Sequence, residues 1–199
     1  WTYSRISRYN RRITVDTEFR VDGPPAAGSY LMRTVEDPTG TRVRGTLNNC
    51  AGGTTPWGTV VSGEENYNAN FRVNGKDPRD ARYGLKDAAT SYGWELDDPR
   101  FDGRNPPGYE YESHRFGWIV EVDPYEPDEA PVKHTAMGRF KHEGANVILS
   151  KRGHAVAYMG DDERFDYVYK FVSKNRFREG SSRGGPPPQQ DAPVRGRPL

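Results

Sequence analysis

Short stretches in which apolar and polar residues alternate recur along most of this chain. In the clearest of them, alternate residues from Phe116 to Val122 are apolar, and Glu121 lies between the last two. A period of two places successive side chains on opposite faces of a strand, so this stretch predicts a strand with one apolar face. Asp123 and Pro124 follow and end it.

Similar stretches follow one another at intervals of about ten residues in the C-terminal half, separated by turn signals. This spacing is typical of a meander of short antiparallel strands, as in a sandwich, a barrel or a propeller blade. A parallel α/β fold needs helices between its strands, and none fits here. The expected strands lie at 13–19, 30–34, 41–47, 57–62, 116–122, 132–137, 145–150, 154–158 and 167–172, and one short helix is expected near 86–92.

The composition also predicts an all-β fold. The 199 residues include 22 glycines and 16 prolines, and 12% are aromatic, whereas Leu, Ile and Met are scarce. Aromatic and β-branched residues suit strands, and Gly and Pro form turns, so short strands are favoured over a helical bundle. Residues 75–115 combine charge with Pro and Gly, which predicts a long loop with little regular structure.

Three segments are expected along the chain. Residues 1–28 are polar and form an N-terminal extension or a partial blade, and residues 29–175 form the main β domain. Residues 176–199 contain mostly Arg, Gly, Pro and Gln without apolar periodicity, so we expect a disordered tail. Because the chain begins at Trp1 and shows no signal peptide, we expect it to be a piece of a longer protein whose targeting segment lies upstream.

Charge and cysteine content exclude several function classes. The net charge is +1 and both signs are interspersed, so nucleic acid is not an expected partner. No apolar stretch is long enough to span a membrane. Cys50 is the single cysteine, so no disulfide forms within the chain. The sequence also lacks the usual motifs of serine and zinc hydrolases, Walker loops and EF-hands.

The densest chemistry lies between positions 48 and 67. Cys50 precedes two glycines that allow a tight turn, and Glu64 and Glu65 end the strand expected at 57–62. Thiolate favours iron, zinc or copper and carboxylate favours calcium or magnesium, so this pattern suits more than one kind of metal. Neighbouring residues on a strand point to opposite faces, so only one of the two glutamates should face a given site, and the pattern does not say which.

Further acidic residues lie at the ends of later strands. Glu143, beside His142, precedes the strand at 145–150, and Asp161 and Asp162 lie in the turn after the strand at 154–158. A rigid scaffold often positions ligands on such loops. Solvated acidic turns and a buried, inert cysteine are the alternative interpretation of these residues.

Several motifs in a fixed order resemble the PhoX-type alkaline phosphatase family. The resemblance extends from about residue 27 to residue 172. Its strongest part is Leu47-Asn48-Asn49-Cys50-Ala51-Gly52-Gly53-Thr54-Thr55-Pro56-Trp57-Gly58-Thr59 followed by Gly63-Glu64-Glu65-Asn66-Tyr67, and the further matches lie at 115–124, 138–145, 158–162 and 167–172.

The resemblance implies a β-propeller, here incomplete, that hydrolyses phosphate monoesters with ferric iron (Fe3+) and calcium (Ca2+). Cys50 occupies the place of a cysteine that binds iron in the family. Glu143 and Asp162 match acidic metal-ligand positions, Glu64 or Glu65 matches a further one, and Asp161 is a weaker match. No catalytic residue besides the metal ligands is assigned.

The family also implies small phosphate esters and metal ions as partners, a monomer, and a periplasmic or secreted location. Its chains are several times longer, so we expect the parent protein to be a phosphatase and this chain alone to be inactive. Two alternatives stay open: a non-catalytic calcium-binding β-propeller module, and another propeller hydrolase of the lactonase or phosphotriesterase type.

Overall fold

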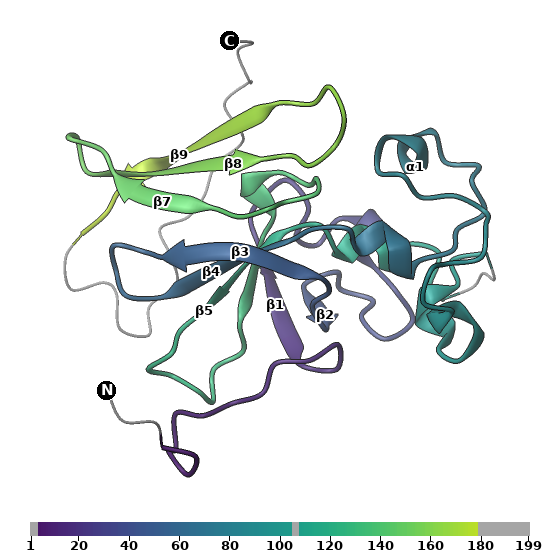
Figure 1. The fold of residues 1–199 in the computed structure, drawn as a ribbon, viewed down its shortest axis with the longest axis horizontal. Coiled ribbons are helices and arrows are strands. Elements are labelled where there is room, and N and C mark those ends of the chain that lie inside the picture. Colours follow the sequence, from purple (N-terminus) through teal and green to yellow (C-terminus); the bar gives the residue numbers. More distant parts are fainter. Residues whose placement is uncertain (1–3, 105–107, 179–199) are drawn as a thin grey trace.

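Two separate β-sheets form the framework of the protein in a computed structural model that describes residues 4–104 and 108–178 (Figure 1). The larger sheet has the strand order β2-β1-β6-β5-β4-β3, and the smaller has the order β7-β8-β9. The strands are β1 (Glu18–Asp22), β2 (Arg42–Arg44), β3 (Asn49–Thr54), β4 (Val60–Glu64), β5 (Ile119–Val122), β6 (Val132–His134), β7 (Asn146–Leu149), β8 (His154–Gly160) and β9 (Val168–Arg176). The expected all-β class agrees with this architecture.

The meander expected in the C-terminal half is divided between the two sheets, and the larger sheet also contains one parallel pair. Strands β3 to β6 form an antiparallel meander, and β7 to β9 form a second one. The β1–β2 hairpin instead joins the larger sheet through a parallel pairing of β1 with β6. A parallel neighbour requires a long connection, and the chain between β2 and β6 supplies it. The larger sheet is therefore mixed.

Strand β5 is buried on both faces, which places it at the centre of the packing. Ile119 belongs to the apolar cluster on one face of the sheet, whereas Trp118 and Val120 belong to a cluster on the other. The first cluster also contains Met159 and Phe171 from the smaller sheet, so it packs the two sheets together. A third cluster, around the fully buried Phe116, lies beneath the long loop.

Several local predictions from the sequence are wrong. Of the strands expected at 13–19 and 132–137, residues 13–17 lie outside β1, and residues 135–137 form a 3-10 helix. Residues 30–34 do not form a strand, because the side chain of Ser29 caps a 3-10 helix at Tyr30–Met32. The short helix lies at Pro78–Arg82 (α1) rather than at 86–92, because Asp77 caps it and Pro78 suits its first position. The glycines after Cys50 do not turn the chain but continue strand β3.

The remaining regular structure consists of short 3-10 helices. They hold the long loop and the connections between strands at Tyr67–Asn70, Trp94–Leu96, Pro99–Phe101, Glu112–Arg115 and Thr135–Met137. The expected disordered tail lies outside the described residues except for 176–178, of which Arg176 ends β9. Within the described ranges, no helix is long and apolar enough to cross a membrane.

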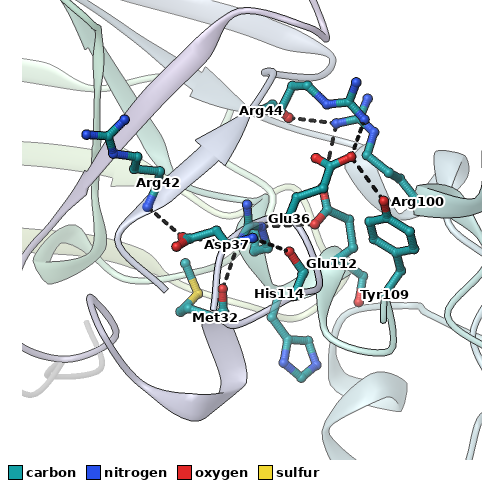
Figure 2. A network of polar contacts seen from close by, with 12 residues as sticks. Met32, Glu36, Asp37, Arg42, Arg44, Arg100, Tyr109, Glu112 and His114 are labelled. Atoms are coloured by element: carbon teal, nitrogen blue, oxygen red, sulfur yellow. Dashed lines mark hydrogen bonds and ion pairs between the residues drawn. The ribbon is translucent and has the colours of Figure 1, made fainter. Parts of the chain in front are cut away.

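A network of polar contacts connects residues 36–44 to the long loop at residues 75–115 (Figure 2). The guanidinium of Arg100 is 1% exposed and donates to the carbonyl oxygen of Arg44 at 2.9 Å. Arg44 in turn contacts Glu36 at 2.7 Å, and the hydroxyl of Tyr109 donates to the same carboxylate at 3.0 Å. Buried charged groups need such partners, so this network fixes both segments.

Glu64 is the most completely engaged acidic residue of the larger sheet. Its fully buried carboxylate lies 2.7 Å from the ammonium of Lys133, which is also fully buried. The hydroxyl of Thr46 and the backbone N–H groups of Gly117 and Trp118 donate to it at 2.8, 2.9 and 3.1 Å. Its two oxygens are therefore occupied by donors from three different segments.

A second buried acid, Glu121, lies between the two sheets. Its carboxylate contacts the Nε2 atom of His134 at 2.6 Å and accepts a hydrogen bond from the indole of Trp57 at 2.7 Å and another from Thr59. Burial opposes ionisation, but contact with His134 and the hydrogen bonds outweigh it and lower the pKa of Glu121 to about 2.

Lys133→Met should destabilise the fold strongly, because it leaves the Glu64 carboxylate buried without a counter-charge. We expect a loss of about 3–5 kcal/mol in the free energy of unfolding, measured by urea denaturation. The matched control is Arg42→Met, which removes the exposed pair with Glu18 and should cost about 0–1 kcal/mol. Equal losses in the two variants would contradict a structural role for Glu64.

Acid should reveal the contribution of Glu121. Its pKa is depressed in the folded protein, so its stabilisation is complete above pH 4.5 and is lost as the pH falls towards about 2. The free energy of unfolding of Glu121→Gln should therefore fall less steeply over this range than that of the wild type. The exposed Glu129→Gln serves as control, and the interpretation fails if Glu121→Gln keeps the wild-type slope.

Candidate metal centre

One row of backbone contacts connects β3 and β4 with the segments that flank the smaller sheet, and it determines the geometry of the candidate site. Asn49 on β3 pairs with Glu64 at the end of β4. The N–H of His142 donates to the carbonyl oxygen of Glu64 at 3.2 Å, and His142 forms an isolated antiparallel bridge with Asp161. These four residues come from segments far apart in sequence, and they lie side by side.

The next residue of each segment is a candidate metal ligand. These residues are Cys50, Glu65, Glu143 and Asp162. Successive side chains of an extended chain point to opposite sides, so Glu65, Glu143 and Asp162 are turned away from the side chains of the row. Carboxylate oxygens of the three acids lie within 4.8 Å of one another. Cys50 lies beside this cluster but is not one of the residues grouped in it, and Glu65 and Glu143 raise the pKa of its thiol.

A bulge in β3 places Cys50. The register between β3 and β4 shifts between Asn49 and Gly52, and the carbonyl oxygen of Cys50 accepts a hydrogen bond from the hydroxyl of Ser62 at 3.0 Å. Asn48, just before the bulge, has a positive φ of 50°. A bulge bends its strand and redirects a side chain, so the turn-like sequence around Cys50 makes an irregular strand.

Glycines allow the smaller sheet to approach β3 and β4. A Cβ atom on Gly63 would lie 2.3 Å from the carbonyl oxygen of His142, and one on Gly144 would lie 2.9 Å from that of Ala51. No larger residue fits at Gly63 without moving the backbone. The segment that carries Glu143 thus approaches the end of β4 closely at Gly63 and approaches β3 closely at Gly144.

The electrostatics of the cluster favour a cation. Burial and the neighbouring carboxylates of Asp162 and Glu143 raise the pKa of Glu65, although the Cys50 thiol opposes them. The N–H of Ala51 stabilises the thiolate of Cys50, but Glu65 and Glu143 outweigh it and raise the pKa of the thiol. A bound cation would stabilise the charged carboxylate of Glu65 and the thiolate of Cys50.

The donor set fits both metals that the resemblance implies. Glu65, Glu143 and Asp162 offer the oxygen ligands that calcium prefers, and Cys50 adds the soft ligand that favours iron. Glu143 and Asp162 are exposed, so further ligands have access to the cluster.

The structure separates the two members of each acidic pair. The carboxylate of Glu64 faces Lys133 in the core, so of the two adjacent glutamates it is Glu65 that reaches the cluster. Asp161 likewise is turned away, because its fully buried side chain contacts Arg82 at 2.8 Å. Glu64 and Asp161 therefore lie outside the set of candidate ligands that the structure brings together.

His142 is also part of the framework rather than of the cluster. Its ring is buried against that of Phe140, and the two ring centroids are 3.6 Å apart. Its Nε2 atom lies 3.0 Å from the carbonyl oxygen of Gly138. Its Nδ1 atom has no hydrogen-bond partner among the described residues, and desolvation lowers the pKa of the ring to about 4. We therefore assign His142 a packing role.

Sequence reasoning missed the residues that hold the row in place. Lys133 and Arg82 are distant in sequence from the acids that they contact, Glu64 and Asp161, and belong to no motif. Alternation along each acidic segment was the available signal, since it predicts one inward and one outward side chain in each pair. The inward partner of each pair could not be identified without the fold.

Comparisons with known proteins bear on this geometry. Residues 1–190 match the family described as alkaline phosphatase PhoX. A solved structure, PhoX of Pseudomonas fluorescens in complex with vanadate, a transition state analogue, is 45% identical with a TM-score of 0.83, and the match covers 92% of this chain. The chain spans 31% of the length of that relative. No curated protein matches. The family resemblance seen in the sequence is confirmed.

Gly63→Ala should disturb the site through the backbone. The added methyl would collide with the carbonyl of His142, so we expect a loss of about 1–3 kcal/mol in the free energy of unfolding, measured by urea denaturation. Gly160→Ala is the matched control, because nothing lies within 4 Å of a Cβ there. A Gly63→Ala variant as stable as this control would contradict the close approach.

Proposed function

Because this chain belongs to the PhoX family of alkaline phosphatases, we propose that it forms part of a metal-dependent phosphatase that hydrolyses phosphate monoesters. The chain spans 31% of the solved relative, so the proposal for catalysis concerns a protein of that length containing these residues. The observation that carries the proposal is the convergence of Glu65, Glu143 and Asp162, with Cys50 beside them.

The proposed centre holds Fe3+ and Ca2+. Cys50 supplies the thiolate for iron, while Glu65, Glu143 and Asp162 supply oxygen ligands. Bound metal ions neutralise the negative charge of a phosphoryl group and activate an oxygen nucleophile. The vanadate complex of the Pseudomonas relative supports phosphoryl chemistry for the family, since vanadate is described there as a transition state analogue.

The residues of this chain perform the positioning in the proposed mechanism. The carboxylates converge from three segments. Because Glu143 and Asp162 are exposed, the cluster is open to solvent on their side. A negatively charged substrate is repelled by bare carboxylates, so these residues contribute to substrate binding only when they hold cations. A small phosphate ester can reach the open side without unfolding any described segment.

The finer features of the family belong to the same proposal. We propose that the two meanders are blades of an incomplete β-propeller, since in each of them consecutive strands pair antiparallel. A monomer in the periplasm or outside the cell is the corresponding proposal for assembly and location.

A non-catalytic calcium-binding module is the second candidate. The three carboxylates suit calcium by themselves, which favours it, whereas the thiol beside Glu65 is unnecessary for calcium and favours the iron-containing phosphatase. A lactonase or phosphotriesterase site relies on oxygen and nitrogen ligands, so iron held through Cys50 would count against that alternative.

The test combines metal content with turnover. Asp162→Asn and Glu143→Gln should weaken binding of Ca2+, measured by titration calorimetry, and lower the hydrolysis of an aryl phosphate by at least about tenfold. Cys50→Ser should lose iron, measured by elemental analysis, together with activity. Glu163→Gln is the control, because this carboxylate contacts Lys141 instead of the cluster.

Each result discriminates between the candidates. Calcium binding without turnover, in a protein of the relative's length, would favour the non-catalytic module. Hydrolysis that is unaffected by chelators and by all three site variants would exclude the proposed centre. Loss of activity in Glu163→Gln equal to that in Asp162→Asn would show that the carboxylate cluster is not specific.

A further inference from the structure

Arg82 connects the long loop to the hairpin that carries Asp162. It is the last residue of α1, and its Nη2 atom lies 2.8 Å from Oδ2 of Asp161 and 3.3 Å from Oδ1 of Asp166. The two aspartates lie on opposite sides of the turn between β8 and β9, and Asp161 is 79 residues from Arg82 in the sequence. One guanidinium thus spans the turn next to the cluster.

The carboxylate of Asp161 is held on both oxygens. Its side chain is 0% exposed, with Oδ2 facing Arg82 and Oδ1 accepting a hydrogen bond from the N–H of Lys141 at 3.3 Å. The N–H of Asp162 donates to the carbonyl oxygen of Lys141 at 3.1 Å. Side-chain and backbone contacts therefore fix the peptide that leads from Asp161 into Asp162.

The carboxylate of Asp162 needs such a support. It lies within 4.8 Å of Glu65 and Glu143, and like charges at this distance repel one another. Asp162 is itself exposed, so packing does not hold its side chain in place. Its backbone is held by the hydrogen bond to the carbonyl oxygen of Lys141 and by the neighbouring Asp161, whose carboxylate contacts Arg82.

We propose that Arg82 is a positioning residue for the metal centre, which acts through Asp161 to hold Asp162 against the repulsion of Glu65 and Glu143. This inference rests on the proposed function. Among the described residues, Arg82 makes its ion pairs with Asp161 and Asp166 and none with the cluster, and it differs from Arg79 of the same helix, whose guanidinium contacts Asp77, the N-cap of that helix. Helix α1 therefore serves to present one arginine to the hairpin.

The test measures the affinity of the full chain for Ca2+ by titration calorimetry with calcium chloride. Arg82→Met should weaken binding by about 10- to 100-fold, as removal of an outer support of a metal ligand typically does. Arg79→Met, the same substitution one turn earlier, should bind as the wild type does. Arg82→Lys should restore part of the affinity, because it keeps the charge but loses the planar fork that spans two aspartates.

Thermal unfolding separates positioning from folding. A purely structural role for Arg82 would lower the melting temperature of Arg82→Met and leave the Ca2+ affinity of the folded variant unchanged, and this result would overturn the proposal. If Arg82→Met does not fold, the double variant Arg82→Met/Asp161→Asn removes both charges of this pair, including the buried one on Asp161. It should fold and still bind Ca2+ more weakly than the wild type, and wild-type affinity in it would overturn the proposal.

The proposed function and the role of Arg82 can be contradicted by different results. Wild-type protein that binds neither Ca2+ nor iron would overturn the proposed function together with the role of Arg82. Tight binding by the wild type and equally tight binding by Arg82→Met would overturn the role of Arg82 and leave the proposed function intact.

Discussion

The hydrogen bond from the N–H of His142 to the carbonyl oxygen of Glu64 joins the two sheets, and the geometry of the candidate centre follows from it. It aligns the end of β4 with the segment before β7, and the bridge from His142 to Asp161 extends the alignment to β8. Because extended chains alternate their side chains, aligning one row of residues also gathers the row that follows it. Three carboxylates are thereby collected without a helix or a dedicated loop.

The inward side chains of that row explain why the alignment is stable. Glu64 is neutralised by Lys133 in the core and Asp161 by Arg82 at the hairpin, while His142 packs against Phe140. Breaking a buried pair costs more than a lost surface contact, because it leaves a charge without solvent. The same acidic sequence pairs therefore supply one group that stabilises the fold and one that faces the proposed metal.

Stability and function make opposite demands at this position. The outward carboxylates repel one another in the folded protein, so the cluster itself opposes folding when no cation is bound. The close approach at Gly63 and the paired charges beneath it offset this repulsion. A cation bound at the cluster would favour the folded state, because it binds the assembled carboxylates better than a dispersed chain.

The sequence by itself determined the all-β class, most strand positions after Phe116, and the residue types of the candidate centre. Alternation and turn residues are local signals, so they needed no knowledge of the fold. Glu143, Asp162 and Cys50 were identified by the family motifs that surround them, although their metals stay a proposal.

Tertiary structure alone decided which member of each acidic pair faces the cluster. A shift of one residue in register exchanges the two faces of a strand, and the sequences Glu64-Glu65 and Asp161-Asp162 are acidic at both positions. The choice depends on Lys133 and Arg82, whose positions relative to the acids are set by long-range packing. The parallel pairing of β1 with β6 and the 3-10 helix at Tyr30–Met32 were beyond local signals for the same reason: contacts between distant segments override local preference.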